Sequence, residues 1–326
     1  MLTKRIRIMI LNKKQKLLIT GGRGFIGVNL VQSLSPNYNV QVLDNMHRPS
    51  PTGWKHSDVK FIEADILETS KLKHAFEGVT HIVHFAAYGS VIESIADPAS
   101  NFSVNVQGTL NVLRAAVEAG VRRLVFASTG GALIGQATPP VSESSLPKPI
   151  SPYGASKLCG EAYCHAFAKS YGIETLCLRF GNVYGQHSWH KKGAVTLFIK
   201  ALMNDEPIVI YGNGTASRDY IHVGDLCAGI EASLNAPLIG GEVFHLASGR
   251  ETEILDLANM LRRIAGKPNH PIIFNEGRGG EVTRNFANYT NAKVAFGFEP
   301  RCQIEDGLAD TWDWFVEQGR LLQKNH

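Results

Sequence analysis

The feature that most constrains the fold is a glycine-rich turn between an apolar run and a helical pattern near the start of the chain. The apolar run covers residues 17–20, Gly21 follows it, and the helical pattern continues to residue 34. Apolar runs and helical patterns then alternate as far as residue 180. Strands that alternate with helices form βαβ units, which build a parallel sheet with helices on both faces. The sequence therefore predicts an α/β, doubly wound parallel sheet whose ligands bind at the carboxyl ends of the strands.

After residue 180 the segments become shorter, and Gly, Asn, Tyr and His become common. We interpret this half as a smaller lobe from which the chain returns to the large sheet once, through a strand at 243–247. The predicted division is a basic extension at 1–16, a cofactor-binding domain at 17–180 plus about 222–247, and a second lobe at 181–221 plus 248–320. The other expected strands are 40–44, 59–62, 81–85, 124–128 and 175–180, and the expected helices are 69–76, 98–119, 152–171, 223–235, 253–265 and 304–318.

The composition excludes several classes of protein. Hydrophobic residues make up 44% of the 326 residues, which excludes general disorder. No apolar run approaches the roughly 18 residues that a membrane span needs. The net charge of +4 comes from the first 16 residues, and the rest of the chain is slightly negative, so no nucleic-acid-binding face is expected. The basic residues of this extension are Lys4, Arg5, Arg7, Lys13, Lys14 and Lys16.

The five cysteines show neither a metal-binding spacing nor a disulfide framework. The histidines are also scattered, so no metal site is expected. Unpaired thiols are typical of a reducing compartment, and we expect a cytoplasmic protein.

The glycine turn predicts a dinucleotide site. Gly21, Gly24 and Gly27 have the spacing GxxGxxG between a strand and a helix, which lets a pyrophosphate approach the helix N-terminus. Asp44 ends the next strand, where a carboxylate accepts hydrogen bonds from ribose hydroxyls and repels a 2′-phosphate, so NAD is favoured over NADP. Arg23 and Arg48 are close enough in sequence to leave NADP open. Asp65, after the third strand, either binds adenine or caps a helix.

Tyr153 and Lys157 form a candidate catalytic pair. Their YxxxK spacing puts both side chains on one face of a helix. We expect the ammonium to lower the phenol pKa toward neutrality and to hold the nicotinamide ribose, which makes Tyr153 a base for hydride removal from a hydroxyl carbon. Ser128 and Thr129 end the preceding strand, where their hydroxyl groups are placed to bind a reacting oxygen, although Ser128 also suits a simple cap or turn.

Short segments along the chain share a characteristic order. Beyond TGGRGFIG at 20–27, they include HFAA at 84–87, NVQGT at 105–109, FASTGG at 126–131, SPYGASK at 151–157 and RFGNVYG at 179–185. With these segments the chain resembles the extended short-chain dehydrogenase/reductase family over residues 16 to about 314. The resemblance is to its NAD-dependent nucleotide-sugar epimerase/dehydratase branch, and in particular to UDP-glucose 4-epimerases. It implies a Rossmann-type sheet with a smaller C-terminal substrate-binding lobe, NAD as cofactor and a UDP-hexose as substrate.

The resemblance also implies roles for single residues. Tyr153, Lys157 and Thr129 take the catalytic positions, with Ser128 beside them. Asn285 falls where a residue controls the space around the sugar's C2 substituent, and Ile134 stands where relatives usually carry tyrosine. The remaining implied cofactor-binding residues are Phe25, Ile26, Asn45, Asp65, Ile66, Phe85, Ala86, Ala87, Asn105 and Phe180, and the implied substrate-binding residues are Ser90, Thr129, Asn182, Tyr211, Arg218, Arg278 and Glu281.

The residues after Thr129 favour one reaction. Relatives that act as 4,6-dehydratases resemble one another in an acid directly after the catalytic threonine, whereas Gly130 and Gly131 stand here. The prediction is therefore a 4-epimerase that works through a transient 4-keto sugar and regenerates NAD. A reductase or 4,6-dehydratase of the same family stays open as the alternative, and a catalytically silent NAD sensor as a remote one. Glucose, N-acetylglucosamine or a uronic acid is the expected hexose.

The resemblance further implies a homodimer. The helices at 98–119 and 152–171 are the candidate interface, and the first of them carries an apolar stripe of Leu110, Leu113 and Val117. The same stripe would equally serve to pack the helix on the sheet.

Overall fold

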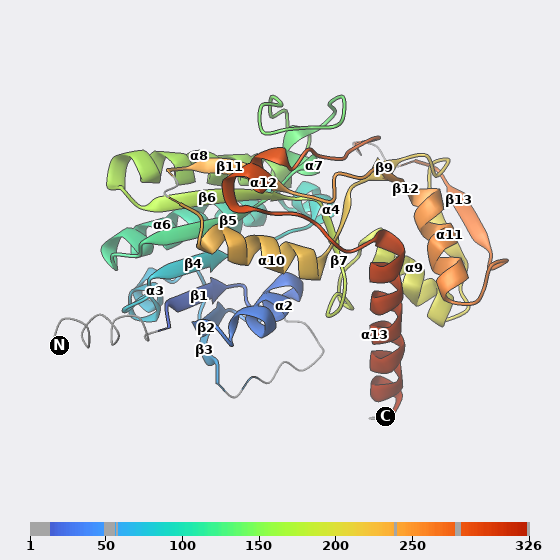
Figure 1. The fold of residues 1–326 in the computed structure, drawn as a ribbon, viewed down its shortest axis with the longest axis horizontal. Helices are drawn as coiled ribbons and strands as arrows, with labels where there is room; N and C mark the ends of the chain where they lie inside the picture. The colour runs from blue at the N-terminus through green and yellow to red at the C-terminus, as the bar shows by residue number, and fades with distance from the viewer. Residues whose placement is uncertain (1–13, 49–55, 57, 238–239, 278–281, 325–326) are drawn as a thin grey trace.

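A seven-stranded parallel sheet forms the centre of the molecule, as the computed structural model shows for residues 14–48, 56, 58–237, 240–277 and 282–324 (Figure 1). Its strand order is β11-β6-β5-β4-β1-β2-β3, and every neighbouring pair is parallel. This confirms the predicted Rossmann-type α/β fold. The strands are β1 (Lys16–Thr20), β2 (Asn39–Asp44), β3 (Lys60–Glu63), β4 (His81–His84), β5 (Arg123–Thr129), β6 (Glu174–Phe180) and β11 (Glu242–Leu246).

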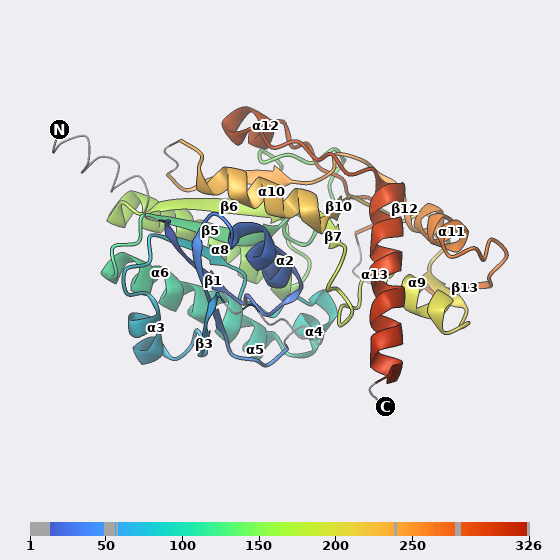
Figure 2. The same ribbon diagram turned by 60° about the horizontal axis from the view of Figure 1, so that its bottom comes forward.

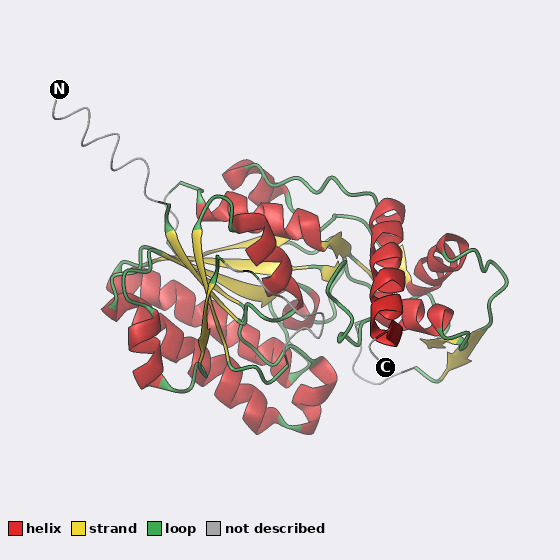
Figure 3. Cartoon of the chain, turned by 90° about the horizontal axis from the view of Figure 1, so that it is seen from below, coloured by secondary structure: helices red, strands yellow, loops and turns green. Residues whose placement is uncertain are grey.

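Helices cover both faces of this sheet (Figure 3). Successive side chains of a strand point to opposite faces, and in β1 Leu17 and Ile19 enter one core while Leu18 enters the other. All three side chains are fully buried, which explains the continuously apolar run in the sequence. The first core is covered by α2 (Phe25–Leu34) and α10 (Val223–Leu234), and the second by α3 (Thr69–Ala75), α6 (Gly108–Glu118) and α8 (Pro152–Tyr171).

The helix predicted at 98–119 is not a continuous α-helix. It consists of α5 (Pro98–Phe102), the π-helical segment η1 (Ser103–Gln107) and α6. Asn105 lies in the π-helical segment and is almost fully buried. Single π-helical turns are frequent at functional sites, and here the side chain of Asn105 binds the loop after β4 and α8.

The apolar stripe of α6 packs on the sheet. Leu113 is fully buried in the second core, and Leu110 and Val117 are partly buried against the same core. Leu113 thus packs on the sheet, whereas Leu110 and Val117 keep part of their surface exposed. Exposed apolar side chains also lie on α4 (Val91–Ala96) and α5, where Ile92, Ile95 and Phe102 are each about 60% exposed.

The second half of the chain builds a smaller cluster with its own core. Its helices are α9 (Ala194–Met203), α11 (Ile254–Ile264) and α13 (Ile304–Lys324), and they enclose buried residues such as Phe198, Leu257 and Phe315. Four short strands border this cluster: β8 (Ile208–Tyr211) pairs with β13 (Ile272–Asn275), and β9 (Ser217–Arg218) pairs with β12 (Thr252–Glu253).

The helix α12 (Thr290–Phe296) lies against β11, on the large sheet (Figure 2). The division of the chain into domains stays a prediction. The chain comes back to the large sheet twice, once through β11 as predicted and again through α12. Within the described ranges, no helix has the length and apolarity to cross a membrane.

Candidate active site

The glycine turn is held tightly against the end of β4. Gly21 has φ +69°, and a Cβ atom there would lie 2.6 Å from the backbone nitrogen of Ala86. Gly27 is as constrained, since a Cβ would lie 2.5 Å from the Cα of Gly22. Gly24 is the N-cap residue of α2 and has no side chain to cap the helix. Phe25 and Ile26 form the first turn of α2, so the free N–H groups of this helix end face the turn.

Asp44 lies at the carboxyl end of β2, beside the glycine turn. Its carboxylate accepts hydrogen bonds from the backbone N–H groups of Arg23 and Met46, both at 2.9 Å. Burial raises the pKa of this carboxyl group, while the two N–H groups lower it. The turn and the carboxylate are therefore joined into one unit.

The ends of β2 and β3 are also joined. Asn45 donates from its amide to Asp65 at 2.8 Å, and the second oxygen of Asp65 accepts from the N–H of Leu67 at 2.8 Å. Asp65 thus makes a turn contact and does not cap α3, whose N-cap residue is Glu68. Adenine binding by Asp65 stays a prediction. Ile66 is buried and packs against Gly108 of α6, so it forms the floor beneath this edge of the sheet.

Asn105 connects the cofactor edge to the catalytic helix. Its amide oxygen accepts from the N–H of Tyr88 at 2.8 Å, and its amide nitrogen donates to the hydroxyl of Ser156 at 3.0 Å. Phe85 and Phe180 meet edge-on, with ring centroids 6.4 Å apart. The structure therefore brings together the ends of β4, β6 and α8 around the predicted cofactor residues, including Ala86 and Ala87.

Tyr153 and Thr129 face each other at the start of α8. Burial raises the pKa of Tyr153 to about 12, and a hydrogen bond with Thr129 lowers it. The expectation that Lys157 lowers this pKa toward neutrality is wrong for the structure. The reason is the direction of the lysine: its Nζ donates to the carbonyl oxygen of Ala127 at 2.9 Å and lies 4.8 Å from the ring centroid of Phe126.

Ser128 does not join Thr129 at the reacting position. Its hydroxyl donates to the carboxylate of Glu161 at 2.6 Å, and Glu161 in turn binds the guanidinium of Arg179. Neighbouring residues of a strand point to opposite faces, which separates the two hydroxyl groups. Ser128 therefore makes a structural contact, and the prediction that it is catalytic is wrong.

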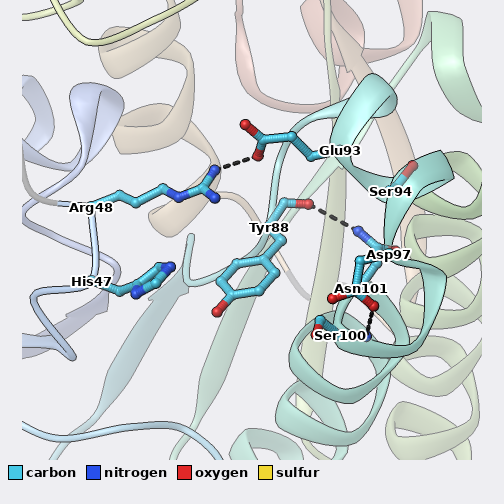
Figure 4. A pocket seen from close by; sticks show the side chains of 8 residues that line it. All are labelled: His47, Arg48, Tyr88, Glu93, Ser94, Asp97, Ser100 and Asn101. Carbon is cyan, nitrogen blue, oxygen red and sulfur yellow. Dashed lines mark hydrogen bonds and ion pairs between the residues drawn. The ribbon is translucent and has the colours of Figure 1, made fainter.

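A pocket of about 280 Å³ opens beside the cofactor edge (Figure 4). Arg48 crosses it from the segment after β2, forms an ion pair with Glu93 of α4 and lies 5.6 Å from the ring centroid of Tyr88. Arg48 is thus directed toward Glu93 of α4. The pocket is lined by His47, Arg48, Tyr88, Glu93, Ser94, Asp97, Ser100 and Asn101.

Two of the predicted substrate residues lie together in the second half. The N–H of Asn182 donates to the carbonyl of Asp219 at 2.6 Å, and Arg218 directly precedes this residue. The contact follows from the parallel pairing of β7 (Asn182–Tyr184) with β10 (Tyr220–His222). Tyr211 ends β8 in a separate two-stranded sheet.

The other predicted substrate residues behave differently. The hydroxyl of Ser90 caps α4 by accepting from the N–H of Glu93. Asn285 is 7% exposed and lies beside the strand end, because a Cβ on Gly131 would be 3.0 Å from its amide nitrogen. Arg278 and Glu281 lie outside the described residues.

Comparison with known proteins decides the family. Residues 17–247 match the model of the NAD dependent epimerase/dehydratase family. The UDP-glucose 4-epimerase of Mycolicibacterium smegmatis is 33% identical, over 91% of this chain and 97% of its own. The chain belongs to the NAD-dependent epimerase/dehydratase family.

Other members of the family are similar to nearly the same degree. The dTDP-glucose 4,6-dehydratase of an Actinoplanes strain is 29% identical, over 92% of this chain and 97% of its own. The crystal structure of the Thermotoga maritima UDP-glucose 4-epimerase with UDP-glucose has a TM-score of 0.89 at 32% identity, and covers 93% of this chain and 99% of that one. Sequence similarity alone thus shows an enzyme of the epimerase/dehydratase type.

The cofactor of this family member is NAD, and the glycine turn fits it. The space beside Gly21 and Gly27 is so narrow that a Cβ atom would collide with the backbone. Such a turn leaves the N–H groups of α2 open to a pyrophosphate. Asp44 stands one strand away with its carboxylate already oriented, as an adenosine ribose requires.

Sequence reasoning missed three groups that organise the site. The hydroxyl of Ser94 accepts from the N–H of Tyr153 at 3.1 Å and so fixes the start of α8. The carboxylate of Asp219 accepts from the N–H groups of Ser248, Gly249 and Ala287. Both contacts join segments far apart in sequence, and no local pattern marks them. The third group is the buried pair of Glu161 and Arg179, described below.

Proposed function

We propose that this family member is an NAD-dependent 4-epimerase of a UDP-hexose that works through a transient 4-keto sugar. The observation that carries the proposal is the arrangement of Thr129, Tyr153 and Lys157. In addition, two glycines follow Thr129 at the positions where a dehydratase needs an acid. A side chain on Gly130 would lie 3.4 Å from the ring of His245, and one on Gly131 would meet Asn285. A Cβ atom would thus be in ordinary contact at Gly130 and in tight contact with the Asn285 side chain at Gly131, and neither position carries an acid in this chain.

The chain's own residues divide the work at the sugar's C4 hydroxyl. Thr129 holds O4 through its hydroxyl, and Tyr153 accepts the O4 proton and later returns it. When bound, oxidised NAD supplies the hydride acceptor and a cationic nicotinamide ring. Positive charge near a buried phenol favours its ionised form, which offsets the burial that raises the pKa of Tyr153 to about 12. Lys157 binds the carbonyl oxygen of Ala127 and is placed to hold the nicotinamide ribose.

The proposal is tested with the purified protein and no added cofactor. We expect UDP-glucose, UDP-N-acetylglucosamine or UDP-glucuronic acid to be converted to its C4 epimer, as seen by NMR of the sugar, while no NADH accumulates. Denaturing the protein should release NAD, which mass spectrometry identifies. Consumption of one NAD(P)H per sugar would instead indicate a reductase, and a 4-keto-6-deoxy product would indicate a dehydratase.

The dehydratase is the second candidate, because a dTDP-glucose 4,6-dehydratase is almost as similar as the epimerases. Elimination at C6 needs an acid and a base beyond Tyr153. Including dTDP-glucose among the substrates separates the two reactions in one experiment.

Asp44 should determine the preference for NAD. Its carboxylate is buried and held by two N–H groups, so it meets a ribose 2′-hydroxyl without rearrangement and repels a 2′-phosphate. We expect Asp44→Asn to weaken NAD binding about tenfold, since a charged acceptor is replaced by a neutral one, and to raise the relative affinity for NADP. Calorimetric titration with both dinucleotides measures this. Asp205→Asn, which changes an exposed carboxylate outside the site, is the control. An unchanged NAD/NADP ratio in Asp44→Asn would contradict the assignment.

The proposal includes a homodimer in the cytoplasm, where five unpaired thiols remain reduced. The expected contact is formed by the helices at 98–119 and 152–171, and the exposed apolar side chains of α4 and α5 lie in and beside the first of these segments. Light scattering behind a sizing column measures the mass, and a mass of about 36 kDa, the value of one chain, would exclude the dimer.

A further inference from the structure

A buried charged group lies beneath the catalytic strand end. Arg179 of β6 binds Glu161 of α8 through two parallel hydrogen bonds, Nε to Oε1 at 2.9 Å and a terminal nitrogen to Oε2 at 2.8 Å. Ser128 of β5 adds a third bond to the same carboxylate at 2.6 Å. Each of the three residues is 6% exposed or less. A buried charge is costly unless it is paired and hydrogen-bonded, so this group must form completely for α8 to pack.

The same two elements also hold Lys157. Tyr153, Lys157 and Glu161 are spaced by four residues and share one face of α8. Lys157 binds the carbonyl of Ala127, and Glu161 binds the hydroxyl of the next residue in β5. Two successive turns of α8 are thus attached to two successive residues of one strand.

The helix lies close to the strand at this point. A Cβ atom on Gly160 would lie 2.3 Å from the ring of Phe126, so only glycine permits the observed distance. The ring of Phe126 is also the one beside the Nζ of Lys157. A rotation or shift of α8 would therefore move Lys157 and break the contacts of Glu161 together.

We propose that Glu161, held by Arg179 and Ser128, is a positioning residue that fixes Lys157 and stabilises its ammonium form for the reaction. The proposal rests on the proposed 4-epimerase function. Glu161 does not touch the reacting atoms, and it acts through Lys157. Arg179 fixes the carboxylate and balances its charge, so the pair is neutral as a whole. Its negative member, Glu161, is the one that lies on the same helix as Lys157.

Charge supports this geometry. Burial lowers the pKa of Lys157 to about 8, and the carboxylate of Glu161 is among the groups that raise it. Burial also lowers the pKa of His84 to about 3 and of His245 to about 4, so both rings are neutral at physiological pH. The titratable groups packed around Lys157 and its partners are Tyr153, Glu161 and Cys164 of α8, Cys177 and Arg179 of β6, His84 of β4 and His245 of β11.

The test compares two variants, one without the negative and one without the positive member of the pair, by the pH dependence of the first hydride transfer. Loss of the Lys157 proton should limit this step on the alkaline side, near pH 8. Glu161→Gln removes the anion and leaves Arg179, so its alkaline limit should fall by about one pH unit. Arg179→Met removes the cation and leaves Glu161, so its limit should rise. A purely structural role would lower the rate in both variants without moving their limits in opposite directions.

Two further variants keep the test decisive if a single variant fails to fold. The double variant Glu161→Leu/Arg179→Leu replaces the buried pair with apolar groups, which proteins often tolerate. Its limit should fall, but by less than in Glu161→Gln, because the positive charge is removed together with the negative one. Ser128→Ala removes one hydrogen bond and no charge, so its limit should stay near that of the native protein. A folded double variant with the native limit would overturn the proposal.

The readout separates this proposal from the overall reaction. Rapid mixing with the sugar nucleotide follows NADH absorbance during the first hydride transfer, which an epimerase and a dehydratase share. A native protein that shows this step without forming an epimer would contradict the 4-epimerase and leave the role of Glu161 testable.

Discussion

Replacing Tyr153 with phenylalanine should lower the rate of sugar interconversion by about a thousandfold, within the range for loss of a general base. The substitution removes only the hydroxyl group of the ring, and this hydroxyl is the partner of Thr129 at the strand end. The backbone N–H of Tyr153 keeps its bond to Ser94, so the start of α8 should remain in place. The rate is measured by NMR with the sugar that the native protein converts.

Tyr163 provides a matched control for this variant. It lies on the same helix, ten residues along, and is 37% exposed. Tyr163→Phe removes the same atom from the same element and should leave the rate within about twofold, since surface substitutions have small effects. If Tyr153→Phe keeps more than a tenth of the native rate, another group must accept the O4 proton.

The parts of the site that the sequence predicted well are those in which one short segment carries both fold and chemistry. The glycine turn is an example: the strand before it, the positive φ of Gly21 and the helix after it are all local consequences of adjacent residues. Tyr153 and Lys157 are similar, because one helical turn sets their relation. The position of Asp44 is predictable because it ends β2, the strand that follows the glycine turn in sequence and pairs directly with β1.

The parts that the sequence could not predict depend on how distant segments pack. Thr129 and Ser128 are neighbours in sequence and both carry a hydroxyl, and only the placement of α8 assigns one to Tyr153 and the other to Glu161. The direction of the Tyr153 pKa depends on the same packing, because burial raises this pKa while the ammonium group of Lys157 binds the carbonyl oxygen of Ala127. The π-helical turn at Asn105 also requires a partner, since its amide bonds reach Tyr88 and Ser156.

Arg123 should be among the most important single residues for stability, although it lies at the opposite end of β5 from the site. It is 1% exposed, binds the carboxylate of Glu174 at 2.9 Å and donates to the carbonyl oxygens of Ser233 and Leu234 at 2.9 Å each. These carbonyls lie at the C-terminal end of α10, so one guanidinium joins β5, β6 and a covering helix.

We expect Arg123→Met to reduce the free energy of unfolding by about 3–5 kcal/mol, the usual cost of removing one partner from a buried ion pair. The neighbouring Arg122 is the control, because its Nε lies 3.5 Å from the same carboxylate but its side chain is 62% exposed. Exposed pairs contribute about 1 kcal/mol or less, so Arg122→Met should change stability little. Urea unfolding followed by circular dichroism compares the two variants. Equal losses would mean that the shared partner Glu174, and not the burial of Arg123, determines the contribution, and that the contacts with α10 add nothing measurable.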